Sequence, residues 1–241
     1  MSPFSLQGQT ALVTGANTGI GQAIAIAMAQ AGASVIAAGR RGCDETLALM
    51  GSGRTLHLDF SDPHAAKDVF AKEPIDILVN NAGIIRREDA VDFSEADWDE
   101  VMDVNLKALF FTCQAFARAA LPRGRGKIVN IASLLSFQGG IRVPSYTASK
   151  HGVAGLTKLM ANEWAARGLN VNAIAPGYIE TNNTQALRDD PERSQAILDR
   201  IPAGRWGQPE DIAQTAVFLA APASDYINGA VLNVDGGWLA R

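Results

Sequence analysis

The segment from residue 130 to 150 carries a tyrosine, a lysine and a serine at a spacing that suits proton transfer. Tyr146 and Lys150 are four residues apart, so a helix over this segment places both side chains on one face. A lysine ammonium beside a phenol favours the phenolate and lowers the pKa of the tyrosine from about 10. Ser133 supplies a hydroxyl that could hold a substrate oxygen against Tyr146. We therefore expect general acid–base catalysis here; the alternative is a surface tyrosine beside a solvated lysine.

A glycine-rich turn, TGANTGIG from Thr14 to Gly21, follows the first expected strand and precedes a helical pattern. Glycines let the backbone turn tightly and approach a pyrophosphate, whose charge a helix N-terminus stabilises. Tight turns use glycine for other reasons as well, but the position at the first strand and helix favours a dinucleotide site.

The end of the second expected strand indicates which dinucleotide is bound. Folds of this kind usually carry an acid there for the ribose 2′-hydroxyl, whereas this chain has Gly39-Arg40-Arg41, and its nearest acid is Asp44. An arginine accommodates a 2′-phosphate, so the sequence favours NADP(H). Arg40 could instead be exposed or stack on adenine, and use of NAD(H) stays open.

Short apolar runs alternate with longer helical patterns along the chain. Strands are expected at residues 10–14, 34–38, 55–58, 75–79, 127–131, 170–174 and 230–234, and helices at 21–31, 98–120, 145–167 and 209–220. Apolar runs without alternation are typical of strands covered on both faces. The pattern predicts a single α/β domain over residues 1–241, a Rossmann-type doubly wound parallel sheet of about seven strands with helices on both faces.

Residues 178–206 interrupt this alternation. The stretch is polar and charged, contains no strand candidate, and has one helical pattern at 194–200. Long loops inside compact domains are usually functional, and this one follows the sixth strand, where ligands of open α/β sheets bind. We therefore expect a substrate lid over about residues 178–206.

Composition excludes several functional classes. The 241 residues are 47% hydrophobic and 19% charged, and a net charge of −4 gives no basic footprint for nucleic acid. No apolar run is long enough for a membrane span, and the first ten residues lack the pattern of a secretory signal, so we expect a cytoplasmic protein. Cys43 and Cys113 are expected to be reduced, and the three histidines have no metal-ligand spacing.

Together these elements resemble the short-chain dehydrogenase/reductase family over essentially the whole chain. The motifs that carry the resemblance are the glycine-rich loop at Gly15, Gly19 and Gly21, Asp59, Asn80-Asn81-Ala82-Gly83, Asn105, Ser133, Tyr146, Lys150, Pro176-Gly177, Thr181 and the terminal VDGG. The resemblance implies an oxidoreductase that transfers a hydride between NAD(P)(H) and a secondary alcohol or ketone.

The resemblance also implies roles for four catalytic residues. Tyr146 is the acid in carbonyl reduction and the base in alcohol oxidation, and Ser133 orients the substrate carbonyl. Lys150 binds the nicotinamide ribose and lowers the pKa of the tyrosine, and Asn105 holds a water that passes protons toward Lys150. A catalytically silent NAD(P)-binding sensor or scaffold is the remote alternative, and it would be expected to lack at least one member of this set.

A larger set is implied to contact the cofactor, with Asp59 at adenine, Asn81 near the ribose and Thr181 at the nicotinamide amide. Asn80 and Asn81 could instead be buried amides that tie neighbouring strands together. The cofactor set is Gly15, Asn17, Thr18, Gly19, Ile20, Gly21, Arg40, Asp59, Asn81, Gly83, Tyr146, Lys150, Pro176, Gly177, Ile179 and Thr181.

Further segments, among them GIIRREDA, SFQGGIRVPSYTASK and ILDRIPAGRWG, resemble members of the family that act on deoxy sugar acids. A sugar acid is an anion, so its pocket should offer an arginine fork. Arg142 is the first candidate, followed by Arg86 or Arg87; each could instead be a surface charge or pair with Glu88 or Asp89. The residues expected to contact substrate are Ser133, Arg142, Tyr146, Arg86 and Asn182.

Other substrates of the family stay open, namely another polyol, a 3-oxoacyl thioester or a steroid. Related enzymes are commonly tetramers, so the resemblance implies a homotetramer with interfaces on the helices at 98–120 and 145–167. The tail GGWLAR, with Trp238, is expected to pack either against a neighbouring subunit or against its own.

Overall fold

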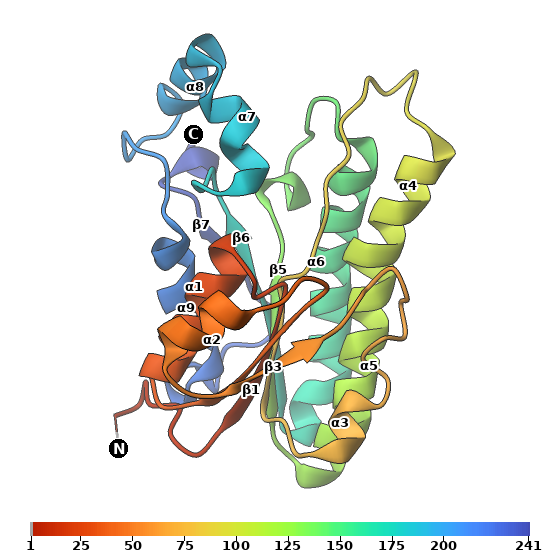
Figure 1. Ribbon diagram of the computed structural model, residues 1–241, viewed down its shortest axis with the longest axis vertical. Helices are drawn as coiled ribbons and strands as arrows, with labels where there is room; N and C mark the ends of the chain where they lie inside the picture. Colours follow the sequence, from red (N-terminus) through yellow and green to blue (C-terminus); the bar gives the residue numbers. More distant parts are fainter. Residues whose placement is uncertain (1) are drawn as a thin grey trace.

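The computed structural model describes residues 2–241 and contains a seven-stranded sheet (Figure 1). The strands are β1 (Thr10–Thr14), β2 (Ser34–Gly39), β3 (Arg54–His57), β4 (Ile77–Asn80), β5 (Gly126–Ile131), β6 (Leu169–Pro176) and β7 (Val231–Val234). Their order is β3-β2-β1-β4-β5-β6-β7, and every neighbouring pair is parallel. The order reverses between β1 and β4, which is the switch point where such sheets bind ligands. The predicted doubly wound parallel sheet is confirmed.

Helices cover both faces of the sheet (Figure 1). They are α1 (Gly19–Gln30), α2 (Asp44–Met50), α3 (Val69–Lys72), α4 (Glu95–Met102), α5 (Ala108–Ala120), α6 (Pro144–Trp164), α7 (Gln185–Arg188), α8 (Pro191–Leu198) and α9 (Pro209–Ala220). In the figure α1, α2 and α9 lie on one side of the sheet, and α3, α4, α5 and α6 lie on the other.

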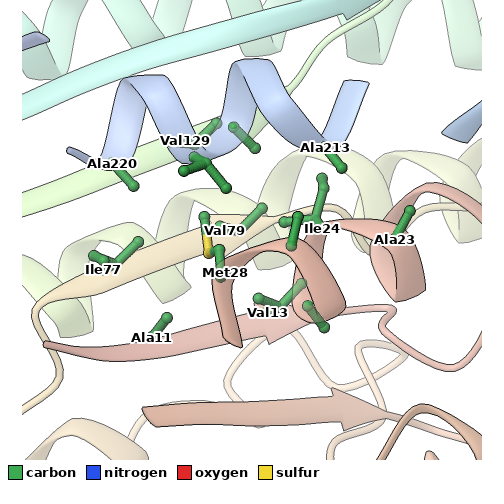
Figure 2. Close-up of a cluster of buried hydrophobic side chains, with 14 of the residues drawn as sticks. Ala11, Val13, Ala23, Ile24, Met28, Ile77, Val79, Val129, Ala213 and Ala220 are labelled. Carbon is green, nitrogen blue, oxygen red and sulfur yellow. The ribbon is translucent and has the colours of Figure 1, made fainter. Parts of the chain in front are cut away.

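Each face of the sheet has its own hydrophobic core, because successive strand side chains point to opposite sides. In β1, Ala11 and Val13 join the core beneath α1 and α9, whereas Leu12 joins the core beneath α5 and α6. Figure 2 shows the first of these cores, in which Ile24 and Met28 of α1 face the strands. Both faces are apolar, which explains the strands without polar alternation.

The predicted helix at 98–120 is longer in the structure and not uniform. It begins at Glu95 because the Ser94 hydroxyl accepts a hydrogen bond from the Asp97 backbone N–H at 3.1 Å. A π-helical turn at Asp103–Lys107 separates α4 from α5 and carries Asn105. Turns of this kind often occur at functional sites. The spacing of apolar residues does not reveal the extra residue in the turn.

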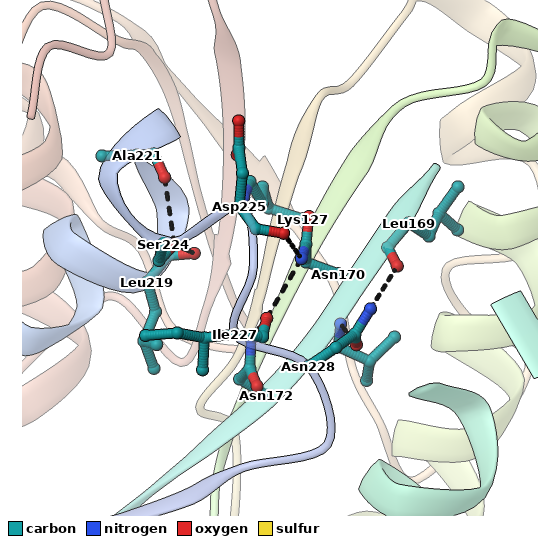
Figure 3. A network of polar contacts seen from close by, with 11 residues as sticks. Lys127, Leu169, Asn170, Asn172, Leu219, Ala221, Ser224, Asp225, Ile227 and Asn228 are labelled. Carbon is teal, nitrogen blue, oxygen red and sulfur yellow. Dashed lines mark hydrogen bonds and ion pairs between the residues drawn. The ribbon is translucent and has the colours of Figure 1, made fainter. Parts of the chain in front are cut away.

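Side-chain amides form hydrogen bonds at the amino ends of the strands, which we call the amino edge of the sheet (Figure 3). Asn170 Nδ2 donates to the carbonyls of Asp225 and Ile227 at 2.9 and 3.0 Å, and Asn172 Nδ2 donates to Ile227 O at 2.9 Å. Lys127 Nζ lies 2.6 Å from Asp225 Oδ1. These bonds tie the loop that leads into β7 to the first residues of β5 and β6.

Residues 178–206 contain no strand; they form a 3₁₀ turn at Asn182–Thr184, followed by α7 and α8. In Figure 1 both helices lie at one end of the molecule, above the carboxyl ends of β6 and β7. Trp238 is only 4% exposed and packs with Ile197 and Trp206 of this region. The tail therefore closes its own subunit, which was one of the two expectations.

Within residues 2–241, no helix has both the length and the apolar character that crossing a membrane requires. The same residues contain no cluster of three metal-ligating side chains. Cys43 and Cys113 are both buried free thiols.

Candidate active site

Ser133, Tyr146 and Lys150 come together at the carboxyl end of β5. Ser133 follows the strand, and Tyr146 and Lys150 stand one turn apart in the first half of α6. Lys150 Nζ lies 5.5 Å from the centre of the Tyr146 ring and donates to the Ile131 carbonyl at 2.6 Å. Pro144 occupies the first turn of α6, where its missing N–H costs nothing. The predicted i, i+4 pair is therefore present on one helix face.

The electrostatics of this pair differ from the expectation. Burial raises the pKa of Tyr146, while a hydrogen bond with the Ser133 side chain and the charge of Arg87 oppose that rise. Burial also lowers the pKa of Lys150 to about 8, because the ammonium has lost water without gaining a carboxylate. The expected lowering of the Tyr146 pKa is thus not seen in the protein alone, since desolvation outweighs the Ser133 hydrogen bond and the Arg87 charge.

Asn105 is 1% exposed, and both polar atoms of its side chain form hydrogen bonds with the backbone of Ile84. Its Oδ1 accepts from the Ile84 N–H at 2.8 Å, and its Nδ2 donates to the Ile84 carbonyl at 2.9 Å. Nδ2 also lies 3.4 Å from Ser149 Oγ. The side chain ties the loop after β4 to α6. Because both of its polar atoms already have partners, a water at this position would have to hydrogen-bond to the backbone of the π-helical turn.

The glycine-rich turn has no room for side chains. A Cβ on Gly21 would lie 2.2 Å from the Gly15 carbonyl oxygen, and one on Gly15 would lie 2.9 Å from Ala82 Cα. Gly15 also has φ of 63°, in the left-handed region that favours glycine. Asn81 Nδ2 donates to the carbonyls of Thr14 and Gly15 at 3.0 and 3.1 Å. The structural alternative for this asparagine is therefore realised in the protein.

Asn80 also has its structural contacts. Its Nδ2 donates to Asn130 Oδ1 at 2.9 Å, and the two residues are register partners in β4 and β5. The amides tie these strands together inside the core.

A cleft runs from the glycine-rich turn to the end of β2. It is lined by Gly15, Asn17, Gly39, Arg40, Arg41, Leu58, Asp59, Phe60, Ser61, Ala82, Gly83, Ile84, Glu100 and Val104. Both arginines are exposed and form no ion pair among the described residues. The N–H of Ser61 holds the pKa of Asp59 below its ordinary value, with smaller help from the Arg40 charge.

The donors of this cleft fit a dinucleotide. Thr18, which precedes α1, makes no side-chain cap, and the first turn of α1 carries no acid. The first N–H groups of that helix are therefore open to a pyrophosphate. Thr181 lies against the same turn, since a Cβ on Gly19 would be 3.3 Å from Thr181 Cγ2.

Of the other predicted cofactor residues, some line a cavity and others have side chains packed in the core. Pro176 and Gly177 line the cavity beside Tyr146. Ile179 is 4% exposed and Ile20 packs on the core, so the side chains of both are occupied in folding.

A second cavity, of about 380 Å³, opens beside Ser133 and Tyr146. Three arginines line it, namely Arg87, Arg193 and Arg200. Among residues 2–241, none that lines this cavity is an aspartate or a glutamate. The three guanidiniums also have no carboxylate within ion-pair distance in that part of the chain. The cavity is therefore positively charged.

Arg142, the first arginine expected to bind substrate, pairs with carboxylates of the protein. Arg142 lies 2.9 Å from both Glu88 and Asp89, and it does not line the cavity. Its φ of 62° is held by these ion pairs and by the Glu88 N–H, which donates to the Arg142 carbonyl at 3.1 Å.

The other candidates stand next to each other in the chain, and in each case one of two adjacent side chains lines the cavity. Arg87, one of the two candidates after Arg142, lines it, whereas Arg86 pairs with Asp97 and Glu100 at 3.3 and 2.7 Å. Asn182 lies outside the cavity lining, whereas Asn183 belongs to it. Which of two adjacent side chains points inward depends on the loop backbone, which the sequence pattern does not specify.

Sequence reasoning missed Arg193 and Arg200, although a signal was present. Arg193, Ala196, Ile197 and Arg200 follow i, i+3, i+4, i+7 spacing, and all four line the cavity. A charged helix face in a predicted lid was the clue.

Fold and site define the class of this protein as an NAD(P)-dependent oxidoreductase with a tyrosine–lysine pair. A family model described as enoyl-(acyl carrier protein) reductase matches residues 15–239. The chain belongs to the short-chain dehydrogenase/reductase family.

Its relatives carry related names. It is 61% identical over 247 residues to the 2-dehydro-3-deoxy-D-gluconate 5-dehydrogenase of Bacillus subtilis, covering 99% of this chain and 97% of the relative. The enzyme of that name from Dickeya dadantii is 57% identical over 251 residues, with 100% and 99% covered. A crystal structure with bound NADP, from Agrobacterium tumefaciens and provisionally assigned as a 2-deoxy-D-gluconate 3-dehydrogenase, is 71% identical with a TM-score of 0.99 over 100% of both chains. The predicted likeness to the deoxy-sugar-acid members is confirmed.

Proposed function

We propose that this enzyme transfers a hydride between NADP(H) and a secondary alcohol or ketone of a deoxy sugar acid, of the 2-deoxy-D-gluconate or 2-dehydro-3-deoxy-D-gluconate type. One observation carries the proposal: three arginines that have no carboxylate partner among residues 2–241 line the cavity that holds Ser133 and Tyr146. An anionic substrate neutralises these charges, whereas a neutral polyol or a steroid leaves them unpaired. The names of the relatives agree with this substrate class.

The proton chemistry is assigned to the chain's own residues. Tyr146 takes the proton of the substrate hydroxyl during oxidation and returns it during reduction, while Ser133 holds the substrate oxygen. Arg87 favours the phenolate through its charge. Lys150 and Asn105 belong to the same proposed catalytic set, with Lys150 near the phenol and Asn105 supporting the loop beside it. Bound NAD(P)+ supplies the hydride acceptor.

The preference for NADP(H) over NAD(H) is part of the proposal. Arg40 and Arg41 directly follow β2 and line the cleft, and the first acid after the strand in the sequence is Asp44. Guanidinium groups bind phosphate through charge-assisted hydrogen bonds. The bound NADP of the Agrobacterium structure supports this choice.

Two further elements complete the proposal. Residues 178–206 act as the lid of the cavity, to which they contribute Arg193 and Arg200. The enzyme works in the cytoplasm as a homotetramer, and the exposed side chains of Trp98 and Leu159 on α4 and α6 are candidates for its interfaces.

Initial rates with 2-dehydro-3-deoxy-D-gluconate, measured with NADP+ and NAD+ in parallel, test the proposal. We expect turnover, faster at low NADP+ than at equal NAD+. The variant Arg40→Ser should raise the KM for NADP+ about tenfold with little change for NAD+, because one charge-assisted hydrogen bond is lost. Absence of turnover in an enzyme that still binds NADP+ would discard the substrate and keep the family chemistry.

A further inference from the structure

The polar groups of the substrate cavity form two sets. The first contains Ser133 and Tyr146, with the charge of Arg87 acting on the Tyr146 hydroxyl. The second contains Tyr178, whose hydroxyl feels the charges of Arg193 and Arg200. The reacting oxygen belongs with the first set, so the second set is free to bind another part of the substrate.

Helix α8 and the turn that follows it place the two arginines of the second set at the cavity. Asp190 caps the helix by accepting a hydrogen bond from the Arg193 N–H at 3.0 Å, and Pro191 occupies the first turn. Ile197 is 4% exposed and anchors the helix in the cluster with Trp206 and Trp238. Arg193 precedes Ile197 by one helical turn and lies on the same face of α8, and Arg200 follows in the turn after the helix ends at Leu198; both arginines line the cavity.

Arg200 is held in place before any ligand binds. Its guanidinium carbon lies 4.2 Å from the centre of the Trp238 ring, a cation–π contact. Trp238 is itself fixed, because its Nε1 donates to Gln138 Oε1 at 3.2 Å. A stacked guanidinium keeps its N–H edge free for a carboxylate and loses little side-chain entropy on binding.

We propose that Arg193 of α8 and Arg200, in the turn that follows α8, bind the carboxylate of the substrate and so select sugar acids over neutral sugars. The inference rests on the proposed function, and it assigns substrate selection to the lid instead of to Arg142. Arg142 and Arg86 already neutralise carboxylates of the protein, so both are poorly suited to bind another one.

The test compares an acid with a neutral relative of it. We would measure kcat and KM for 2-dehydro-3-deoxy-D-gluconate and for its methyl ester with the wild type, Arg193→Gln, Arg200→Gln and the double variant. Each single change should raise the KM for the acid about tenfold, and the double change further. The kcat should change less, and the KM for the ester should hardly change. Arg200→Lys should recover part of the loss, because it keeps the charge without the fork.

Arg118→Gln is the matched control. Arg118 is an exposed arginine of α5 that lies outside both proposed binding regions. The substitution therefore removes the same charge as the test variants without changing the cavity. Its KM for the acid should equal that of the wild type.

Failure of the inference is separable from failure of the proposed function. If the wild type turns over the acid and the double variant keeps the wild-type KM, the carboxylate is bound elsewhere and the inference falls. If the wild type shows no turnover, the proposed function falls, and binding of gluconate to the NADP+ complex by calorimetry decides the inference. Binding that the double variant loses supports the carboxylate site, whereas no binding to the wild type overturns it.

Discussion

Charged side chains at the amino ends of the strands (the amino edge) differ in their pairing from those at the carboxyl ends (the carboxyl edge). At the amino edge, charges have partners: Asp76 lies 2.9 Å from Arg123 and 3.5 Å from Arg125, and Lys127 lies 2.6 Å from Asp225. At the carboxyl ends of the strands, the buried Lys150 donates to a backbone carbonyl and has no carboxylate within ion-pair distance among residues 2–241. The arginines of the substrate cavity also lack carboxylates there among the described residues.

This contrast separates stability from function. A charge paired within the chain contributes to the folded state and has little left to offer a ligand. A charge left unpaired costs stability until a ligand of opposite charge arrives. Arg142 illustrates the point, because its two ion pairs place it with the structural group although it lies in the loop between Ser133 and Tyr146.

The largest effect is expected at the carboxyl edge, from Tyr146→Phe. Loss of the phenolic hydroxyl removes the proposed acid and base, so turnover should fall about 10²- to 10⁴-fold. NADP(H) binding should stay near the wild-type value, as measured by fluorescence titration. The matched control is Tyr226→Phe, since Tyr226 is fully exposed and distant in sequence from the site. Near-normal turnover in Tyr146→Phe would refute the catalytic assignment.

A somewhat smaller effect concerns the pH dependence of folding. Burial lowers the pKa of Lys150 from 10.5 to about 8. Between these two values the unfolded chain binds the proton that the folded chain has released, so the unfolding free energy rises with pH. The full shift corresponds to roughly 3 kcal/mol. Urea unfolding from pH 7 to 10 should show this rise in the wild type relative to Lys150→Met. A constant difference between the two proteins would mean that Lys150 keeps its proton in the fold.

The smallest effect is expected at the amino edge, from Asn172→Ala. Asn172 is 1% exposed; its amide donates to Ile227 O and accepts from the Ala230 N–H at 3.0 Å. The change removes both bonds and leaves the Ala230 N–H without its partner, whereas Ile227 O keeps the bond from Asn170 Nδ2, so the unfolding free energy should fall by about 1 kcal/mol. The KM for the acid should not change, because the network lies away from the cavity. A raised KM would show that the two edges are coupled.

Much of the fold could be predicted because its signals are local. Strand β1 and helix α9 have the predicted bounds, and the other predicted strands shift by one or two residues at their ends. Strand β4 begins at Ile77 instead of residue 75. The short helices α2, α3 and α7 were not predicted, since four to seven residues hold too few apolar positions to show a period.

The sequence by itself determined the sheet class, the glycine-rich turn and the pairing of Tyr146 with Lys150, because strand pattern, backbone freedom and helical spacing act within a few residues. Only the tertiary structure decided which arginines face the cavity. It paired Arg86 and Arg142 with carboxylates and left Arg87, Arg193 and Arg200 without them. The raised pKa of Tyr146, opposite to the expected direction, and the lowered pKa of Lys150 also required the tertiary structure. Both outcomes depend on burial and on contacts between distant segments, which no local pattern encodes.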